Sequence, residues 1–192
     1  MIYRTFGKRL IDFLASLTLL IVLAIPLAFL AMGVRLFLGK PVFFRQERPG
    51  WKGNIFRMFK FRTMTEACGE DGSLLPDADR MTRFGIFLRR TSLDELPELF
   101  NVLKGEMSLV GPRPLILAES EMHEGRRKNG VYTLRPGMTG LSQVNGRDGL
   151  SDGEKIDIDT KYLYEFGLMQ DVKILAKTLT AVVRGEGNKD KI

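Results

Sequence analysis

The longest hydrophobic stretch of the chain runs from Phe13 to Val34 and contains no charged residue. As a straight helix it would be about 33 Å long, which is enough to cross the hydrocarbon core of a membrane. A cleaved signal peptide is the first alternative. However, the stretch is longer than the apolar region of a signal peptide, and no clear cleavage site follows it. The pattern therefore predicts a membrane segment.

Charges and a proline indicate how this segment sits in the membrane. Pro26 lacks a backbone donor and clashes with the preceding turn, so a break there leaves arms of about 20 and 14 Å, each too short to cross. Basic residues flank both ends, and the positive-inside rule draws both ends to the cytoplasm. They are Arg4, Lys8 and Arg9 before the stretch and Arg35, Lys40, Arg45, Arg48 and Lys52 after it. We predict a re-entrant helix hairpin broken at Pro26. A single span is the alternative, because proline is tolerated in spanning helices.

Two aromatic-rich runs follow the membrane segment, at 42–46 and 55–61. They are separated by Pro49, Gly50 and Gly53, residues that are typical of turns. Short β-prone runs on either side of such a turn predict a β-hairpin.

The middle of the chain is predicted to consist of loops and helices. Residues 66–80 are polar, acidic and interrupted by glycine and proline, which predicts a mobile loop. Residues 83–90 and 93–103 have helical patterns, with Pro97 either starting a new helix or lying in a first turn. GPRPLILAESEMHEGRR predicts a rigid turn followed by a helix. The glycine-rich RPGMTGLSQVNGR predicts a loop whose backbone lies close to a neighbouring group.

The C-terminal helix is predicted to be amphipathic. Its apolar face consists of Val172, Leu175, Ala176, Leu179 and Val183, and its basic face of Lys173, Lys177 and Arg184. Two interpretations fit this pattern: a helix packed on the core, and a helix lying on anionic lipid.

The composition of the chain limits which kinds of catalytic site it can form. The 192 residues suit one unit, which we divide into a membrane-anchoring segment, 1–40, and a catalytic domain, 41–192. The net charge of +6 favours an anionic partner: phosphates, nucleic acid or acidic lipid. Cys68 and His123 are the single cysteine and histidine, so neither a zinc cluster nor a Ser-His-Asp triad can be formed. The lone cysteine favours a reducing, cytosol-facing location. Carboxylates and basic residues must therefore perform any catalysis.

The motif RRTSLDELPEL places two adjacent carboxylates, Asp94 and Glu95, directly behind arginines. One interpretation is purely structural: Ser92 caps a helix, and Glu95 completes a capping box. The other is phosphoryl transfer, because a carboxylate can attack phosphorus or help to bind Mg²⁺. Nearby basic residues favour the second interpretation; they are Lys60, Arg62, Arg89, Arg90 and Arg113. Nucleic-acid binding is disfavoured, since no known nucleic-acid-binding module is recognisable.

Longer blocks make the sequence resemble a known family. They are KRLIDF, VFFRQERPGWKGNIFRMFKFRTM, LRRTSLDELPELFNVLKGEMSLVGPRP and RPGMTGLSQVNGR. Over residues 3–184 the chain resembles the small monotopic phosphoglycosyl transferases, which are bacterial polyprenol-phosphate sugar-1-phosphate transferases. In the combination SLDELP followed by SLVGPRP the resemblance is specific.

The resemblance implies a reaction and a location. A UDP-sugar donates its sugar-1-phosphate to polyprenol (undecaprenol) phosphate and UMP is released, with Mg²⁺ required. The active site would lie on the cytoplasmic face of the bacterial inner membrane. The implied fold is α+β and mainly helical, with a re-entrant membrane helix, a short β-hairpin and amphipathic interfacial helices around a small catalytic core. The family's expected Ser-Pro pair is replaced here by Ile25 and Pro26.

The resemblance also implies roles for individual residues. Asp94 corresponds to the nucleophile and metal contact, and Glu95 to the second carboxylate of the dyad. Arg89 and Arg113 correspond to phosphate-binding positions, with Lys60 as a supporting cation. The remaining implied contacts are Arg62 as a further supporting cation, and Gln143 and Arg147 for the nucleotide or sugar.

We therefore expect a transferase in which Asp94 attacks the β-phosphorus of a UDP-sugar and polyprenol phosphate then accepts the sugar phosphate. Its partners would be the donor, the lipid acceptor and membrane lipids, without nucleic acid. Two alternatives remain: a membrane-anchored phosphohydrolase that uses the same aspartate, and a non-catalytic lipid-binding scaffold. Neither the sugar nor the oligomeric state is specified by the sequence.

Overall fold

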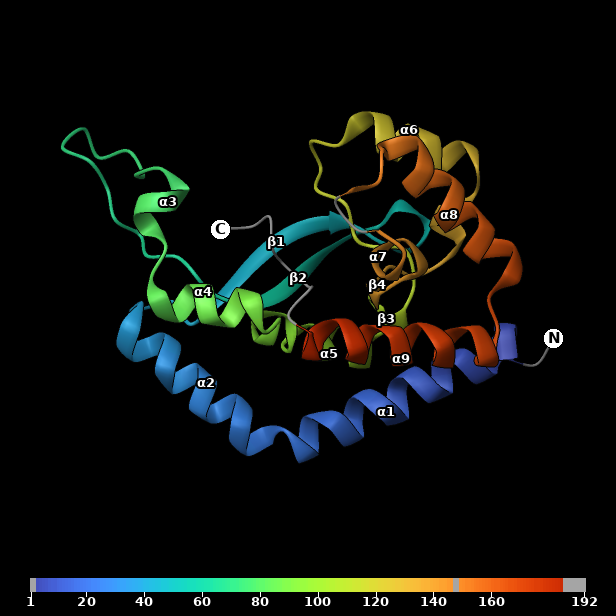
Figure 1. Cartoon of the computed structure of the whole chain (residues 1–192), viewed down its shortest axis with the longest axis horizontal. Coiled ribbons are helices and arrows are strands. Elements are labelled where there is room, and N and C mark those ends of the chain that lie inside the picture. The colour runs from blue at the N-terminus through green and yellow to red at the C-terminus, as the bar shows by residue number, and fades with distance from the viewer. Residues whose placement is uncertain (1–2, 147–148, 185–192) are drawn as a thin grey trace.

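The computed structural model describes residues 3–146 and 149–184 and has an α+β fold that is mainly helical (Figure 1). The α-helices are α1 (Lys8–Val22), α2 (Ala24–Phe37), α3 (Asp77–Arg80), α4 (Arg83–Arg90), α5 (Glu98–Lys104), α6 (Ser120–Lys128), α7 (Leu141–Val144), α8 (Asp152–Glu165) and α9 (Leu168–Val183). The strands are β1 (Phe43–Pro49), β2 (Ile55–Phe61), β3 (Ser108–Val110) and β4 (Gly137–Thr139). A π-helical turn, η1 (Tyr3–Gly7), precedes α1, and short 3₁₀ turns are η2 (Trp51–Gly53), η3 (Leu93–Glu95) and η4 (Val131–Thr133).

The hydrophobic stretch forms a bent helix pair. α1 and α2 meet at Leu23 with an angle of 66° between them. The bend lies three residues before Pro26, the residue that was predicted to break the helix. Proline lacks the N–H that would bond to the carbonyl four residues earlier, and its ring clashes with that carbonyl. The first helix consequently ends before Pro26, which lies in the first turn of α2, where a donor is not needed.

The bend produces two nearly equal arms. With 15 and 14 residues, α1 and α2 are about 22 and 21 Å long. Among the described residues no single helix is long and apolar enough to cross a membrane, whereas the bent pair reaches that length and composition together.

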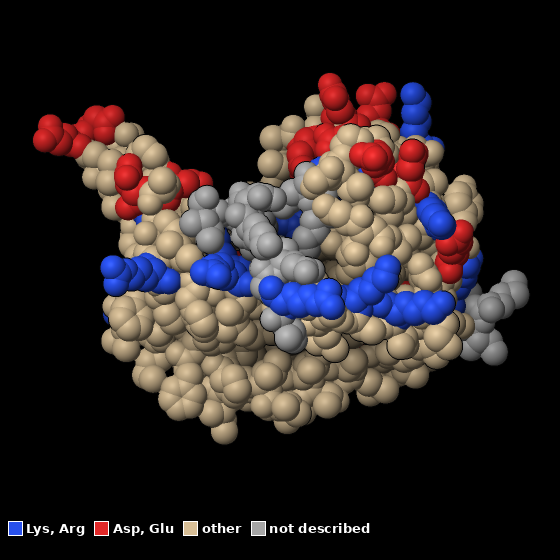
Figure 2. Space-filling model, viewed as in Figure 1, with Lys and Arg blue, Asp and Glu red and all other residues tan. Residues whose placement is uncertain are grey.

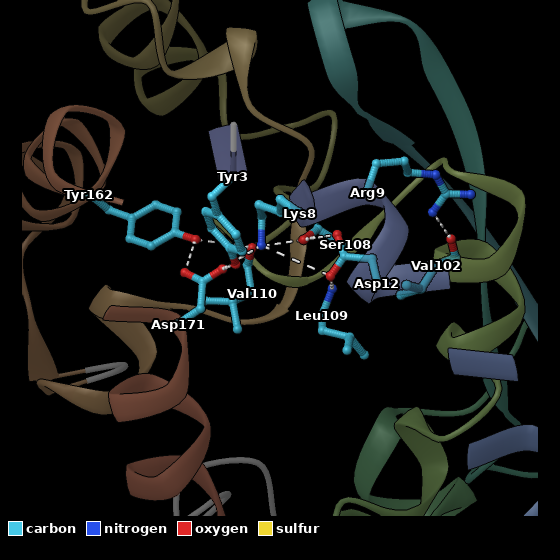
Figure 3. Close-up of polar contacts among 10 residues, drawn as sticks. All are labelled: Tyr3, Lys8, Arg9, Asp12, Val102, Ser108, Leu109, Val110, Tyr162 and Asp171. Atoms are coloured by element: carbon cyan, nitrogen blue, oxygen red, sulfur yellow. Dashed lines mark hydrogen bonds and ion pairs between the residues drawn. The ribbon is translucent and has the colours of Figure 1, made fainter. Parts of the chain in front are cut away.

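A polar cluster fixes the start of the helix pair to the rest of the protein (Figure 3). Asp171 of α9 accepts hydrogen bonds from Tyr3, Lys8 and Tyr162, at 2.5, 2.7 and 2.6 Å. Asp12 accepts two further hydrogen bonds from β3. These contacts join η1 and α1 to α8, α9 and β3.

The other end of the helix pair is held by one hydrogen bond and by apolar contacts. The carbonyl of Leu38, just after α2, accepts a hydrogen bond from Arg62. A buried cluster joins α2 to β2 and α4, and its members are Val34, Leu38, Phe61 and Leu88. Both ends of the bent pair therefore contact one folded body.

The predicted hairpin is confirmed. β1 and β2 are antiparallel, with Phe44 opposite Lys60. Since side chains alternate between the two faces of a strand, Phe44, Gln46 and Arg48 share one face of β1. Asn101 of α5 supports the hairpin: it accepts from the backbone N–H of β2 residue 59 at 3.0 Å and donates to the carbonyl of residue 57 at 2.8 Å.

A second, parallel strand pair, β3 and β4, was not predicted from the sequence. It depends on close backbone packing between glycines. A Cβ atom on Gly137 or Gly140 would lie 2.1 Å from a backbone atom of Gly111. The glycine-rich loop thus packs against the chain's own GPRP turn.

The structure around the acidic motif agrees with the predictions in part. α4 matches the predicted helix over 83–90, and Pro97 begins a new helix as the N-cap of α5. The capping box of Ser92 and Glu95 is wrong, because the described residues show no capping hydrogen bond from the Ser92 side chain. Ser92 instead adopts a left-handed conformation with φ of 55°. Residues 66–80 contain the short helix α3 and project from the body (Figure 1).

The C-terminal helix α9 combines features of both predicted interpretations. One side packs on the core through the buried residues Asp171 and Ile174. Apolar side chains on its other side remain exposed; they are Leu168, Met169, Val172, Leu175 and Leu179. The start of α9 contacts the start of α1 through Asp171 and Lys8, and α9 lies above α1 in the view of Figure 1.

Candidate active site

A cavity of about 560 Å³ lies between one face of the β-hairpin, the 62–66 segment, α3 and the α4–η3 connection. Its lining is strongly basic. The basic residues that line it are Arg48, Lys60, Arg62, Arg80, Arg89 and Arg113. Asp94 also lines it and is 8% exposed. The structure therefore brings together Asp94 and four of the five basic residues predicted around it; Arg90 is not among the described residues that line the cavity.

The two adjacent carboxylates face different surroundings. Asp94 lines the large cavity, whereas Glu95 lines a smaller one beside it. Glu95 Oε1 lies 2.6 Å from Lys60 Nζ. The structure thus places Asp94 against the space where a substrate can bind and Glu95 against a basic side chain.

Lys60 of β2 is shared by two carboxylates. Besides Glu95, its Nζ atom lies 3.3 Å from Glu98 Oε1. Burial alone would lower the pKa of Lys60, but Glu95, Glu98 and Asp94 outweigh burial and raise it. Burial raises the pKa of Glu98 to about 7, against the opposing effect of Lys60. Lys60 therefore stays charged, while Glu98 titrates near neutrality.

Arg89 is oriented by a close contact between α4 and the chain after β2. Its Nε atom donates to Thr63 Oγ1 at 2.9 Å. α4 approaches this segment closely because Gly85 has no side chain: a Cβ there would lie 1.8 Å from the Thr63 carbonyl oxygen. Arg62 is partly engaged elsewhere, since it bonds to the Leu38 carbonyl and lies 3.5 Å from Glu66.

Arg113 and Arg48 form the other end of the basic lining. Arg48 donates to the Pro114 carbonyl at 3.3 Å and to Gln46 at 2.5 Å. Burial, and then the nearby Arg113, lower the pKa of Arg48. In the described part of the chain, no carboxylate lies within salt-bridge distance of either arginine. Two neighbouring guanidinium groups with this environment suit a bound anion such as a phosphate.

The structure does not bring every proposed residue to the cavity. Gln143 is buried in α7 and donates to the Met138 carbonyl at 3.4 Å, and it is not among the described residues that line the cavity. Arg147 lies outside the described residues. Their proposed nucleotide or sugar contacts stay predictions.

Three cavity or support residues were missed from the sequence: Arg48, Thr63 and Glu98. Arg48 lies beyond the predicted run 42–46, but β1 extends to Pro49, so Arg48 shares a face with Gln46. Thr63 and Glu98 gave no local signal. Their partners, Arg89 and Lys60, lie far away in the sequence.

The donor set fits a magnesium ion that is bound mainly by its substrate. Within residues 3–146 and 149–184, no group of three or more His, Cys, Asp or Glu side chains is arranged to hold a metal. Mg²⁺, however, is commonly bound by one or two carboxylates together with substrate phosphates. Asp94 supplies one carboxylate in a cavity whose basic residues suit a diphosphate.

Comparison with known proteins assigns this arrangement to a family. The family model described as bacterial sugar transferase matches residues 3–185. An uncharacterized sugar transferase, EpsL, from Bacillus subtilis is 42% identical over 94% of this chain and 89% of its own length. The galactosyl transferase CpsE of Streptococcus agalactiae is 38% identical over 95% of this chain, which spans only 43% of that relative.

A third relative has a more specific name. The UDP-glucose:undecaprenyl-phosphate glucose-1-phosphate transferase of Caulobacter vibrioides is 38% identical over 92% of this chain and 69% of its own length. The matched regions include Asp94 and its basic surroundings, since the family model extends from residue 3 to residue 185. The chain belongs to the bacterial sugar transferase family.

Proposed function

We propose that this protein transfers a sugar-1-phosphate from a UDP-sugar to polyprenol phosphate and releases UMP, as the first membrane step of glycan assembly. The observation that supports this proposal is the buried Asp94 carboxylate in a cavity lined by six basic side chains. A sugar nucleotide carries two phosphates, and the cavity offers guanidinium groups suited to both. The name of the Caulobacter relative describes the same reaction for glucose.

In the first step, an Asp94 carboxylate oxygen attacks the β-phosphorus of the donor. A bond forms between Asp94 and phosphorus, and the bond between the two phosphates breaks, with its electron pair leaving on UMP. Arg113 and Arg89 would bind phosphate oxygens, and Lys60 would stabilise the charge that develops on them. Bound Mg²⁺, held by Asp94 and the diphosphate, would neutralise charge on the leaving UMP.

In the second step, a phosphate oxygen of polyprenol phosphate attacks the same phosphorus. The Asp94–phosphorus bond breaks, and its electron pair returns to the carboxylate. The product is polyprenol diphosphate sugar. No histidine is required as a general base for a carboxylate nucleophile, because a free carboxyl group is already ionised at neutral pH.

We further propose that α1 and α2 form a re-entrant hairpin in the cytoplasmic leaflet of a bacterial inner membrane. Both ends of the pair contact one folded body, through Asp171 at one end and Phe61 at the other. Each arm, at about 22 and 21 Å, is shorter than the hydrocarbon core of about 30 Å. A single span would have to place these two ends on opposite sides.

The surface agrees with this orientation. Figure 2 shows a broad face along the lower side of the molecule without lysine, arginine, aspartate or glutamate, a row of basic side chains above it, and acidic side chains higher up. Exposed apolar residues of the helix pair include Leu14, Ile21, Ile25, Phe29 and Leu36. Apolar side chains suit the acyl region, and lysine and arginine suit anionic head groups. α9 would lie at this interface.

UMP release tests the reaction. The native protein in liposomes with Mg²⁺ would be incubated with a panel of UDP-sugars, with and without undecaprenyl phosphate. We expect sustained UMP release from one donor with the acceptor present, and one equivalent per enzyme without it. Asp94→Asn should reduce release to background. Asp79→Asn, an exposed carboxylate in α3, is the matched control and should keep native activity.

The alternatives give different results. A phosphohydrolase would release UMP continuously without the lipid acceptor. A scaffold would release none, and Asp94→Asn would then leave lipid binding intact. The covalent intermediate is tested separately by mass spectrometry of the acceptor-free sample, where a sugar phosphate bound to the peptide that contains Asp94 is expected.

Cysteine labelling tests the membrane orientation. Single cysteines would be introduced at Ile2 and Lys40 after replacement of Cys68 by serine. We expect an impermeant reagent to label both positions from the same side of sealed vesicles. Labelling from opposite sides would contradict the re-entrant hairpin.

A further inference from the structure

A buried ion pair lies next to the cavity and is not part of its lining. Arg126 of α6 and Asp159 of α8 are 3% and 1% exposed, with Nη2 and Oδ2 2.5 Å apart. The second Asp159 oxygen accepts a hydrogen bond from Ser142 at 3.0 Å. The remaining terminal nitrogen of Arg126, Nη1, donates to the Arg113 carbonyl oxygen at 2.7 Å. The pair thus reaches a residue that lines the cavity.

The GPRP turn depends on such external donors. Pro112 and Pro114 have no backbone N–H, so the turn has few donors of its own. Three successive carbonyls accept from other parts of the chain: Pro112 from the Gly137 backbone at 2.9 Å, Arg113 from Arg126, and Pro114 from Arg48 at 3.3 Å. Arg126 therefore fixes the orientation of the peptide from which the Arg113 side chain extends.

Stability alone does not account for this arrangement. Removing two charges from water is energetically costly, and apolar replacements of buried ion pairs are often neutral or stabilising. α6 and α8 also contact each other closely at a second point, since a Cβ on Gly125 would lie 2.4 Å from Ile156 Cδ1. An apolar pair at these positions would lack the hydrogen bond from Ser142 and, with more effect on the cavity, the hydrogen bond to the Arg113 carbonyl.

We propose that Arg126 is a positioning residue for Arg113, and that Asp159 holds Arg126 in the geometry this requires. Arg126 acts through the Arg113 peptide and does not contact the substrate. The inference rests on the proposed function in one respect, namely that Arg113 binds a phosphate of the donor.

A double-mutant cycle tests the coupling. Arg126→Met, Arg113→Lys and the double variant would be compared by kcat/KM for the active donor. We expect Arg126→Met to lower kcat/KM at least tenfold in the native background and less than threefold in the Arg113→Lys background. Arg127→Met, on the exposed side of α6, is the control for the loss of one charge and should change nothing. Additive effects of the two substitutions would overturn the proposal.

A second variant separates positioning from folding. Arg126→Lys keeps a positive charge for Asp159 but cannot reach both Asp159 and the Arg113 carbonyl with a planar fork. We expect its melting temperature to stay near the native value while kcat/KM falls. A lowered melting temperature with native kcat/KM would show a merely structural role and would overturn the proposal.

The same double-mutant cycle can be measured by ligand binding, without catalytic turnover. The dissociation constant of UDP for the same four proteins reports on phosphate binding directly. If the native protein binds UDP but turns over no donor, the proposed function fails while the coupling between Arg126 and Arg113 is still measured. If turnover is normal and both cycles are additive, only the positioning role fails.

Discussion

Replacing Glu98 by glutamine changes one buried charge beside Lys60. Glu98 is 3% exposed, and its Oε1 atom lies 3.3 Å from Lys60 Nζ. Burial raises its pKa from 4.5 to about 7, because the free-energy cost of removing the carboxylate from water exceeds the stabilisation by the Lys60 charge. Glutamine has nearly the same shape and does not titrate, so the variant isolates this ionisation.

The size of the effect follows from the pKa change. A shift from 4.5 to about 7 corresponds to about 3 kcal/mol, at about 1.4 kcal/mol per unit. The folded protein binds this proton more tightly than the unfolded chain does. The resulting stabilisation is fully present below pH 4.5 and is lost as the pH rises through about 7. For a chain of this length, about 3 kcal/mol corresponds to a change of roughly 6–12 °C in melting temperature.

Thermal unfolding in lipid nanodiscs between pH 4.5 and 8.5 measures this difference. We expect the melting temperature of the native protein to fall by roughly 6–12 °C relative to Glu98→Gln over that range. Other titrating groups cancel because only the difference between the two proteins is used. Glu121→Gln, an exposed carboxylate of α6, should give a curve parallel to the native one. A parallel curve for Glu98→Gln as well would refute the reasoning.

Three other substitutions test contacts that stabilise the fold. Gly85→Ala should prevent α4 from approaching Thr63, because the new Cβ would lie 1.8 Å from a backbone oxygen; we expect loss of folded protein in size-exclusion chromatography. Tyr162→Phe removes a 2.6 Å hydrogen bond to Asp171 and should lower the free energy of unfolding by about 1–3 kcal/mol, measured by denaturant titration. Ser151→Ala removes the observed capping box of α8 and should lower the same quantity by about 1 kcal/mol with unchanged UMP release.

The sequence predicted those elements whose periodic patterns are long enough to be read locally. β2 and α4 match their predicted ranges, since alternation and helical spacing each extend over several residues, whereas β1 extends beyond the predicted run 42–46 to Pro49. β3 and β4 have three residues each, which is too short to show a period. The helix break was displaced from Pro26 to Leu23 because proline disrupts the turn before it.

Most of the charged residues of the site could be predicted from the sequence, whereas the residues that hold them in place could not. Asp94 and Arg113 stand in motifs whose composition suits phosphate chemistry, and the resemblance named their roles. Glu98 was missed because its partner lies on another element, and such pairing is visible only after folding. Gln143 is a different case. A polar residue in a glycine-rich loop is typical of ligand contacts, and its proposed contact stays a prediction, while the glycines of this loop pack it against the chain's own GPRP turn.

The backbone explains how two adjacent carboxylates in one motif come to face different cavities. A regular helix with a capping box would have turned Glu95 back toward Ser92. Instead, Ser92 takes a left-handed conformation and a 3₁₀ turn follows, in which successive side chains point about 120° apart. Asp94 therefore faces the large cavity while Glu95 reaches Lys60. A left-handed serine costs roughly 1–2 kcal/mol, and strain of this kind is concentrated at functional sites. The conformation is consistent with a motif in which one carboxylate reacts and its neighbour holds a cation in place.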